Sequence, residues 1–142
     1  MATIRKEIMI EAKVEHVWDA VRDVGAVHRR LVPDYTVDTQ IDGDNRILTF
    51  ANGAVVRELI VSVDDEARRL AYAVVEGPMP LKHHHASFQV LAESDSHSRL
   101  IWITDFLPDE RAMDVRARVD RGAEVMKQTI EAEIKNGPSN GA

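Results

Sequence analysis

Three consecutive histidines, His83, His84 and His85, are the most conspicuous side chains for chemistry in this sequence. They open a segment, residues 82–92, whose alternating apolar and polar residues are typical of a strand. Neighbouring residues of a strand face opposite sides of a sheet, so three adjacent imidazoles cannot converge on one metal ion. His83 and His85 could form a weak outer-face site with Asp105. We favour an exposed polar strand instead, and the sequence predicts no metal site.

His84 is predicted to face the opposite, inner side of the sheet, and Tyr72 is predicted to face the same side from a neighbouring strand. An imidazole titrates near neutral pH, so it can transfer protons or form a hydrogen bond to a ligand. His84 and Tyr72 are therefore the candidate catalytic residues. The alternative for His84 is a core histidine bonded to a neighbouring group.

Arg46 and Arg57 are predicted to project from paired strands onto the same inner face. A buried guanidinium needs a partner or water, because burying an unpaired charge is costly. If both are unpaired, they would suit a carboxylate, enolate or phosphate on an otherwise apolar ligand. The alternative is a structural salt bridge, for which Glu76 is a candidate, or a side chain that reaches solvent at the rim of the sheet.

Turn residues determine the register that places these side chains. Asn52-Gly53 is the strongest hairpin signal in the chain. A two-residue turn there would place Leu48 opposite Arg57 and Arg46 opposite Leu59. A later turn, near residues 94–98, would place Val90 opposite Trp102. Side chains alternate with period two, so these registers define one mostly apolar inner face.

A long amphipathic helix over residues 109–135 follows the strands. Its apolar residues recur every three or four positions: Ala112, Val115, Val119, Ala123, Met126, Ile130 and Ile134. A lone helix after antiparallel strands must bury this face against the sheet, and a curved sheet around one helix commonly leaves a cavity. Gly122 lowers helix stability by roughly 1 kcal/mol relative to alanine, which would be explained if the sheet or a ligand approaches the helix there.

The predicted fold class is α+β. A first strand over residues 3–12 is followed by two short helices, at 14–24 and 26–31, and then by the strands 36–41, 46–51, 55–63, 70–76, 82–92 and 99–107. Residues 1–135 are predicted to form a single domain, and residues 136–142 a flexible tail. The predicted ligand-binding residues on the inner face and the long helix are Arg46, Leu48, Phe50, Arg57, Leu59, Tyr72, His84, Phe88, Trp102, Gly122 and Met126.

Composition excludes several functional classes. The net charge of −6 argues against nonspecific nucleic-acid binding. No segment is apolar enough for a signal peptide or a membrane span, so a cytoplasmic protein without membrane insertion is expected. The 142 residues include no cysteine, phosphate-binding glycine loop, GxSxG elbow or HExxH zinc helix, and no cofactor is implied.

Three segments carry a family resemblance: VEHVWDAVRDVGAVHRRLVP at residues 14–33, VVRELIVSVDDEARRLAYAVVEG at 55–77 after the Asn52-Gly53 turn, and SRLIWITDFLP at 98–108. In this order and spacing the sequence resembles the polyketide cyclase/dehydrase branch of the START-like (SRPBCC) superfamily, the helix-grip group that includes the birch pollen allergen. The resemblance implies a curved seven-stranded antiparallel sheet around the C-terminal helix. It also implies a hydrophobic small molecule in the cavity between them.

The resemblance does not imply one activity, since some members catalyse cyclisation, dehydration or hydrolysis and many are carriers or sensors. Relatives often place a tryptophan ahead of the proline that ends the second helix, where this chain has polar residues at 28–30, so a more polar cavity mouth is expected.

Three functional hypotheses remain open. The leading one is a carrier or sensor for a hydrophobic small molecule that could be anionic. The second is a cyclase- or dehydratase-like enzyme, in which His84 and Tyr72 move protons and Arg46 or Arg57 stabilises an enolate. The third is an interaction module with a filled core. Ile101 and Ile103, on the outer face, mark a candidate homodimer interface.

Overall fold

The structure, a computed structural model, describes residues 1–135, and antiparallel strands are the largest part of it. Seven strands form one sheet in the order β1-β7-β6-β5-β4-β3-β2. The strands are β1 (Ala2–Ile10), β2 (Thr36–Asp42), β3 (Asn45–Phe50), β4 (Val55–Asp64), β5 (Arg69–Glu76), β6 (His83–Ala92) and β7 (Ser98–Leu107). The helical elements are α1 (Val14–Arg22), the π-helical turn η1 (Val27–Leu31), the 3-10 turn η2 (Asp109–Arg111) and α2 (Ala112–Lys135).

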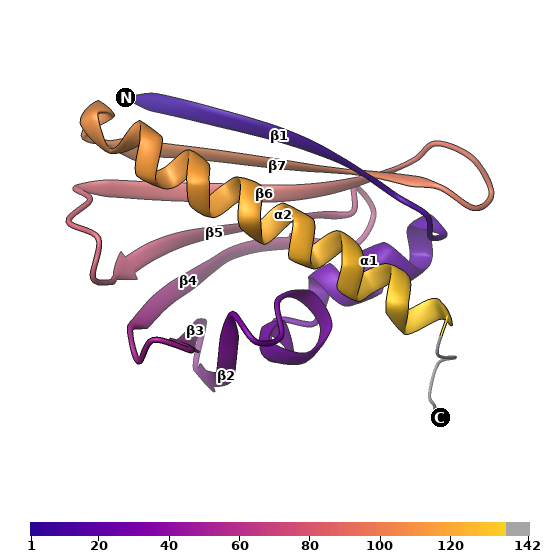
Figure 1. The fold of residues 1–142 in the computed structure, drawn as a ribbon, viewed down its shortest axis with the longest axis horizontal. Coiled ribbons are helices and arrows are strands. Elements are labelled where there is room, and N and C mark those ends of the chain that lie inside the picture. Colours follow the sequence, from indigo (N-terminus) through magenta and orange to yellow (C-terminus); the bar gives the residue numbers. More distant parts are fainter. Residues whose placement is uncertain (136–142) are drawn as a thin grey trace.

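The predicted helix-grip architecture is confirmed: one long helix, α2, lies across the inner face of the curved sheet (Figure 1). Successive strands from β2 to β7 are neighbours, so short turns connect them. The strands β1 and β2 are the two edges of the sheet, and α1 and η1 therefore bridge from one edge to the other. The tail predicted for residues 136–142 lies outside the described residues.

The two short elements after β1 form because their apolar residues recur with helical spacing. In α1 the residues Val14, Val17, Trp18 and Val21 are buried. The helix ends at Arg22, two residues before the predicted end at 24. The Nε1–H of Trp18 donates to Oδ1 of Asp65 at 2.9 Å, which ties α1 to the turn between β4 and β5.

The long helix α2 buries the face predicted from its periodicity. Its buried residues are Val115, Val119, Gly122, Ala123, Met126 and Ile130. Ile134, predicted on the same face, is 42% exposed, so the last turn extends beyond the core. Within residues 1–135, no helix is both long and apolar enough to cross a membrane.

Two predicted strand registers differ from the structure, with different consequences. In the β6–β7 pair Val90 lies opposite Leu100 rather than Trp102. A shift of two residues keeps every side chain on its predicted face. In the β3–β4 pair Leu48 lies opposite Val56 and Arg46 lies opposite Glu58. This shift of one residue moves the whole start of β4 to the other face.

The β3–β4 error arises in the turn. The Phe50 N–H donates to the Ala54 carbonyl at 2.8 Å and the Gly53 N–H to the Phe50 carbonyl at 2.9 Å, so the loop has three residues instead of two. A two-residue type I′ turn needs positive φ at both central residues, but only Gly53 has it, at +89°. Asn52 instead accepts the Ala54 N–H through its side-chain oxygen at 2.9 Å.

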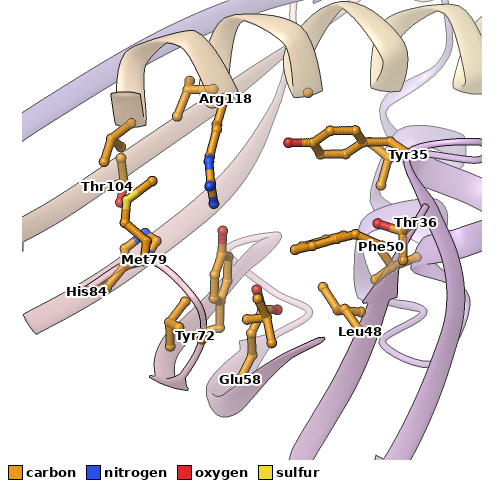
Figure 2. A pocket seen from close by; sticks show the side chains of 18 of the residues that line it. Tyr35, Thr36, Leu48, Phe50, Glu58, Tyr72, Met79, His84, Thr104 and Arg118 are labelled. Atoms are coloured by element: carbon orange, nitrogen blue, oxygen red, sulfur yellow. The ribbon is translucent and has the colours of Figure 1, made fainter. Parts of the chain in front are cut away.

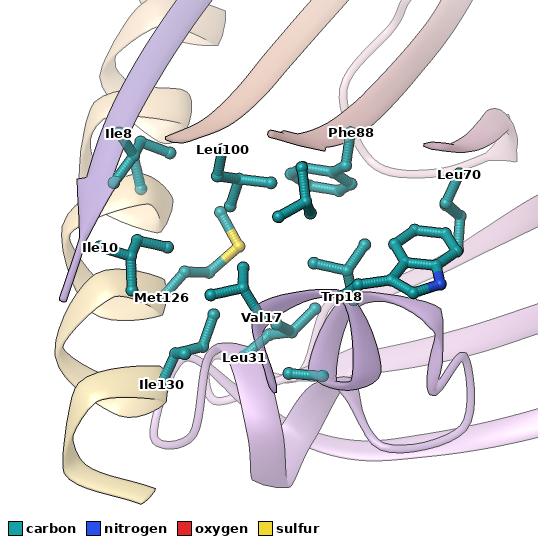
Figure 3. Close-up of a cluster of buried hydrophobic side chains, with 14 of the residues drawn as sticks. Ile8, Ile10, Val17, Trp18, Leu31, Leu70, Phe88, Leu100, Met126 and Ile130 are labelled. Atoms are coloured by element: carbon teal, nitrogen blue, oxygen red, sulfur yellow. The ribbon is translucent and has the colours of Figure 1, made fainter. Parts of the chain in front are cut away.

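The main hydrophobic core lies where α1 and the C-terminal half of α2 meet the sheet (Figure 3). Its most completely buried side chains include Ile10, Val17, Leu70, Leu100 and Ile130. A second, smaller cluster joins the N-terminal half of α2 to the strands at the β1 edge through Ile4, Phe106, Val115 and Val119. These clusters hold α2 to the sheet at both ends.

Candidate functional site

A cavity of about 360 Å³ separates α2 from the inner face of the sheet. Side chains from η1, from β3 to β7 and from α2 form its walls, and the segment between β5 and β6 borders its mouth. Figure 2 shows the lining side chains pointing toward a common centre. Such a volume is within the range of small-molecule binding sites.

One end of the cavity is aromatic and apolar. The rings of Tyr35 and Phe50 lie 5.6 Å apart, centroid to centroid, next to Leu48 (Figure 2). Thr36 lies behind them and is 1% exposed. Its hydroxyl oxygen is buried and has no hydrogen-bond partner among the described residues. This end can therefore hold an apolar group and offers one unused polar atom.

A buried ion pair lies in the sheet wall of the cavity. Nε of Arg46 donates to Oε1 of Glu58 at 2.7 Å, and these residues are only 4% and 6% exposed. The guanidinium also lies over the ring of Tyr72, 5.3 Å from its centroid. Burial, and then the negative charge of Glu58, raise the pKa of the Tyr72 hydroxyl above its ordinary value. Tyr72 is consequently a protonated donor at neutral pH.

His84 lines the cavity near Met79 and Thr104 (Figure 2). Burial, followed by the charges of His83, Arg118 and His85, lowers its pKa from 6.5 to about 4. The imidazole is therefore neutral at pH 7 and can accept a proton or a hydrogen bond. Its conjugate acid is too acidic to be a populated proton donor at that pH.

Arg118 is a lining residue that the sequence analysis did not single out. It is an exposed residue of α2, and its guanidinium reaches from the helix into the cavity, toward the Tyr72 hydroxyl (Figure 2). Arg46 and Arg111 pair with Glu58 and Asp114, whereas Arg118 forms no salt bridge within residues 1–135. Its spacing from Val115 and Gly122, three and four residues, is the signal that could have placed it at the edge of the apolar face.

Trp102 and Gly122 form the contact between sheet and helix beside the cavity. A Cβ added to Gly122 would lie 3.2 Å from Cη2 and 3.2 Å from Cζ3 of Trp102. Glycine therefore lets the indole approach the helix backbone, as its position in the predicted helix suggested. The Phe88 ring packs on Trp102 at 4.9 Å between centroids. The Trp102 Nε1–H is buried without a hydrogen-bond partner among the described residues.

Most of the predicted ligand-binding residues do line the cavity: Arg46, Leu48, Phe50, Tyr72, His84, Phe88, Trp102, Gly122 and Met126. The inward orientation predicted for Arg57 and Leu59 is wrong, because the three-residue turn shifts β4 by one position. Arg57 instead pairs with Asp42 at 3.0 Å and with Glu76 at 3.5 Å. Val56 and Glu58 take the inward places.

The outer-face histidines do not form a metal centre. His85 lies directly opposite Asp105, whose Oδ1 accepts a hydrogen bond from the Thr3 hydroxyl at 2.7 Å. No group of three or more metal-ligating side chains occurs in the part of the chain that the structure describes.

The polar residues predicted at the cavity mouth are directed elsewhere. His28 bonds Thr39 at 2.9 Å, and Arg30 pairs with Asp19 and Glu133, each at 2.9 Å. The side chains that η1 contributes to the cavity are the apolar Val27 and Leu31. The exposed charged residues in the cavity lining are instead Arg118 of α2 and Glu76 at the end of β5.

A family profile described as "Polyketide cyclase / dehydrase and lipid transport" matches residues 1–137, and the chain belongs to this family. No curated protein matches the sequence significantly.

Solved structures share the fold at low sequence identity. A Thermobifida fusca protein solved by solution NMR is 25% identical, with a TM-score of 0.76 over 100% of this chain and 98% of that one. Norcoclaurine synthase from Thalictrum flavum, in complex with dopamine and hydroxybenzaldehyde, is 18% identical, with a TM-score of 0.76 over 98% and 89%. BexL, a di-domain ARO/CYC of the BE-7585A biosynthetic pathway, is 19% identical, with a TM-score of 0.78 over 97% of this chain and 48% of BexL.

Proposed function

We propose that this protein binds a hydrophobic small molecule in the cavity between α2 and the sheet, as a carrier or sensor. The observation that carries the proposal is the cavity itself, about 360 Å³ with mainly apolar walls. An empty apolar space of this size loses packing contacts, so a fold that keeps it open favours a ligand that fills it. The family description, which includes lipid transport, and the aromatic ligands named for norcoclaurine synthase support this class.

A second candidate function is cyclase- or dehydratase-like catalysis. Tyr72, Glu58 and His84 contribute to one cavity wall, so a bound molecule could contact a proton donor and a neutral base together. Arg57 is on the outer face and Arg46 is already paired with Glu58, so neither is free to stabilise an enolate. The cavity holds a donor and an acceptor without an arranged nucleophile, and binding is the better-supported function.

A filled-core interaction module has the least support of the three hypotheses, because the cavity is large compared with the voids of an ordinary core. The predicted homodimer interface at Ile101 and Ile103 stays a prediction. Ile101 is 8% exposed within the single chain, which leaves little of it for a partner.

The test compares two tryptophan substitutions in the sheet. Val74→Trp adds its volume on the inner face, inside the cavity, whereas Leu59→Trp adds the same group to the outer face. Native mass spectrometry of the freshly purified proteins would look for a retained small molecule. Calorimetry would measure binding of the probe 2-naphthamide.

We expect the wild type and Leu59→Trp to bind the probe with one-to-one stoichiometry and Val74→Trp to lose binding. Equal binding by both variants would exclude the cavity as the site. Absence of both a retained molecule and probe binding in the wild type would contradict the proposal as a whole.

A further inference from the structure

One charged side chain at the cavity, Arg118, has no salt-bridge partner among the described residues. Arg46 is neutralised by Glu58 at 2.7 Å, and Glu76 lies 3.5 Å from Arg57. His84 is neutral at pH 7 because burial lowers its pKa to about 4. Among the described residues that line the cavity, Arg118 is therefore the ionised side chain without a counter-ion. The Arg118 guanidinium is thus available to pair with a negatively charged group of a ligand.

Hydrogen-bond donors gather on the side that Arg118 faces. The Tyr72 hydroxyl stays protonated, and Figure 2 shows it pointing toward the Arg118 guanidinium. The Trp102 Nε1–H lies close enough to Tyr72 to oppose slightly the rise in the Tyr72 pKa that burial causes. The Nε1–H nevertheless has no hydrogen-bond partner among the described residues. The Tyr72 hydroxyl and the unpaired Arg118 guanidinium thus face the same part of the cavity. A ligand oxygen placed between these two groups could accept hydrogen bonds from both.

From this we infer that the ligand is an amphipathic monoanion, a carboxylate on an aromatic or aliphatic body. The carboxylate would accept from Arg118 and Tyr72 at the mouth, and the body would lie against Tyr35 and Phe50. A single unpaired guanidinium matches one negative charge, and its planar fork suits a carboxylate. The inference rests on the proposed function, since it names the class of ligand for that same cavity.

The experiment measures two isosteric probes, 2-naphthoate and neutral 2-naphthamide, by calorimetry with the full chain at pH 7.5. The variants are Arg118→Gln and the matched control Arg116→Gln, which removes the same charge from an exposed residue of α2 outside the cavity lining. Arg118→Lys tests charge without the planar fork. Thermal unfolding checks that the variants stay folded, which is expected because Arg118 is exposed and forms no salt bridge with a described residue.

We expect the wild type to bind 2-naphthoate at least about tenfold more tightly than 2-naphthamide, and Arg118→Gln to abolish that preference while leaving amide binding within about twofold. Arg116→Gln should keep the preference, and Arg118→Lys should retain part of it. Equal binding of the two probes by the wild type, or a preference that survives Arg118→Gln, would overturn the inference and leave the proposed function standing. Failure of both probes to bind the wild type would overturn the inference, and together with the absence of a retained small molecule it would overturn the proposed function as well.

Discussion

Arg46 and Glu58 are two buried charges that depend on each other at the wall of the cavity. Removing an ion from water is unfavourable, and the mutual attraction of a buried pair offsets that loss only while both members remain. The sequence predicted a buried Arg46 in need of a partner but named Glu76, because the predicted register turned Glu58 outward. Of the alternatives predicted for Arg46, the structure shows the structural salt bridge, with Glu58 as its partner.

Single and double substitutions of this pair should differ sharply. Glu58→Met leaves Arg46 buried without an anion, and we expect the free energy of unfolding to fall by about 3–5 kcal/mol. The double variant Arg46→Met/Glu58→Met removes both charges and should lie within about 2 kcal/mol of the wild type. Urea denaturation at pH 7.5 measures both. Additive losses in the double variant would show that the two residues do not depend on each other.

His84 should make stability depend on pH. The pKa of His84 is about 4 in the folded chain and has its ordinary value of 6.5 when unfolded. Above pH 6.5 both states are neutral, and between pH 6.5 and 4 only the unfolded state takes up the proton. The free energy of unfolding therefore falls as the pH falls through this window, by about 1–3 kcal/mol.

The comparison with His84→Gln isolates this contribution, since the other titrating groups are common to both proteins. Urea denaturation at pH 7.5 and pH 4.5 should show a smaller loss of stability on acidification for His84→Gln than for the wild type. Identical losses would mean that His84 is protonated equally in both states.

At the scale of elements, the length of the β3–β4 loop decides which side chains of β4 face the cavity, since one more loop residue reverses their orientation. The turn from Ala51 to Gly53 closes with three residues, and Gly53 adopts a φ of +89° that favours glycine. A three-residue loop of this kind places Val56 and Glu58 inward. The same loop therefore sets both the partner of Arg46 and the outward position of Arg57.

A substitution at Gly53 should be destabilising for backbone reasons alone. A Cβ at this position meets no atom within 4 Å, so Gly53→Ala is expected to reduce the free energy of unfolding by about 1 kcal/mol through its positive φ. Gly25→Ala is the matched control, because its added Cβ lies at an ordinary 3.5 Å from Ile41 and its φ is not left-handed. Chemical denaturation distinguishes them, and equal losses would contradict the assigned turn.

At the scale of the whole molecule, the sheet curves around α2 but the side chains do not fill the enclosed space. The main core occupies the end where α1 meets α2 and the sheet (Figure 3), and the cavity lies beyond it, lined by Val115 to Met126 of α2 and by the strands facing them. Hydrophobic clusters at both ends of α2 hold the helix to the sheet. The cavity shares walls with both clusters, through residues such as Phe88 and Met126 of the main core and Val119 of the smaller one.

Ligand binding should stabilise the whole chain, because the cavity exists only in the folded state. At a concentration 100 times its Kd, 2-naphthoate should add about 2.7 kcal/mol, which corresponds to a rise of about 5–10 °C in Tm for a chain of this length. Leu59→Trp should show the same rise and Val74→Trp little or none. A scanning calorimeter measures each shift, and an equal rise in Val74→Trp would place binding outside the cavity.

Local patterns in the sequence determined the strands, the long helix and most of the cavity wall. Alternation identified the inward side chains of β5, β6 and β7, and even the β6–β7 register error left Tyr72, His84 and Trp102 on the correct face. Helical spacing identified Val115, Val119 and Met126 as buried. The low helix propensity of Gly122 suggested a close approach only as one of two interpretations, and the structure shows the approach of Trp102. These features depend on short-range periodicity, which needs no knowledge of distant contacts.

Tertiary structure alone decided the electrostatics of the cavity. Whether Arg57 or Glu58 faces it depends on one loop residue, and that choice is made by backbone hydrogen bonds at the turn. Arg118 lies at the edge of an apolar helix face, where the sequence period permits either solvent or cavity, and the facing strands determine which one it reaches. The sequence therefore left open whether an arginine in the pocket would be free to bind a ligand, and only the packing of α2 on the sheet brought Arg118 to the cavity.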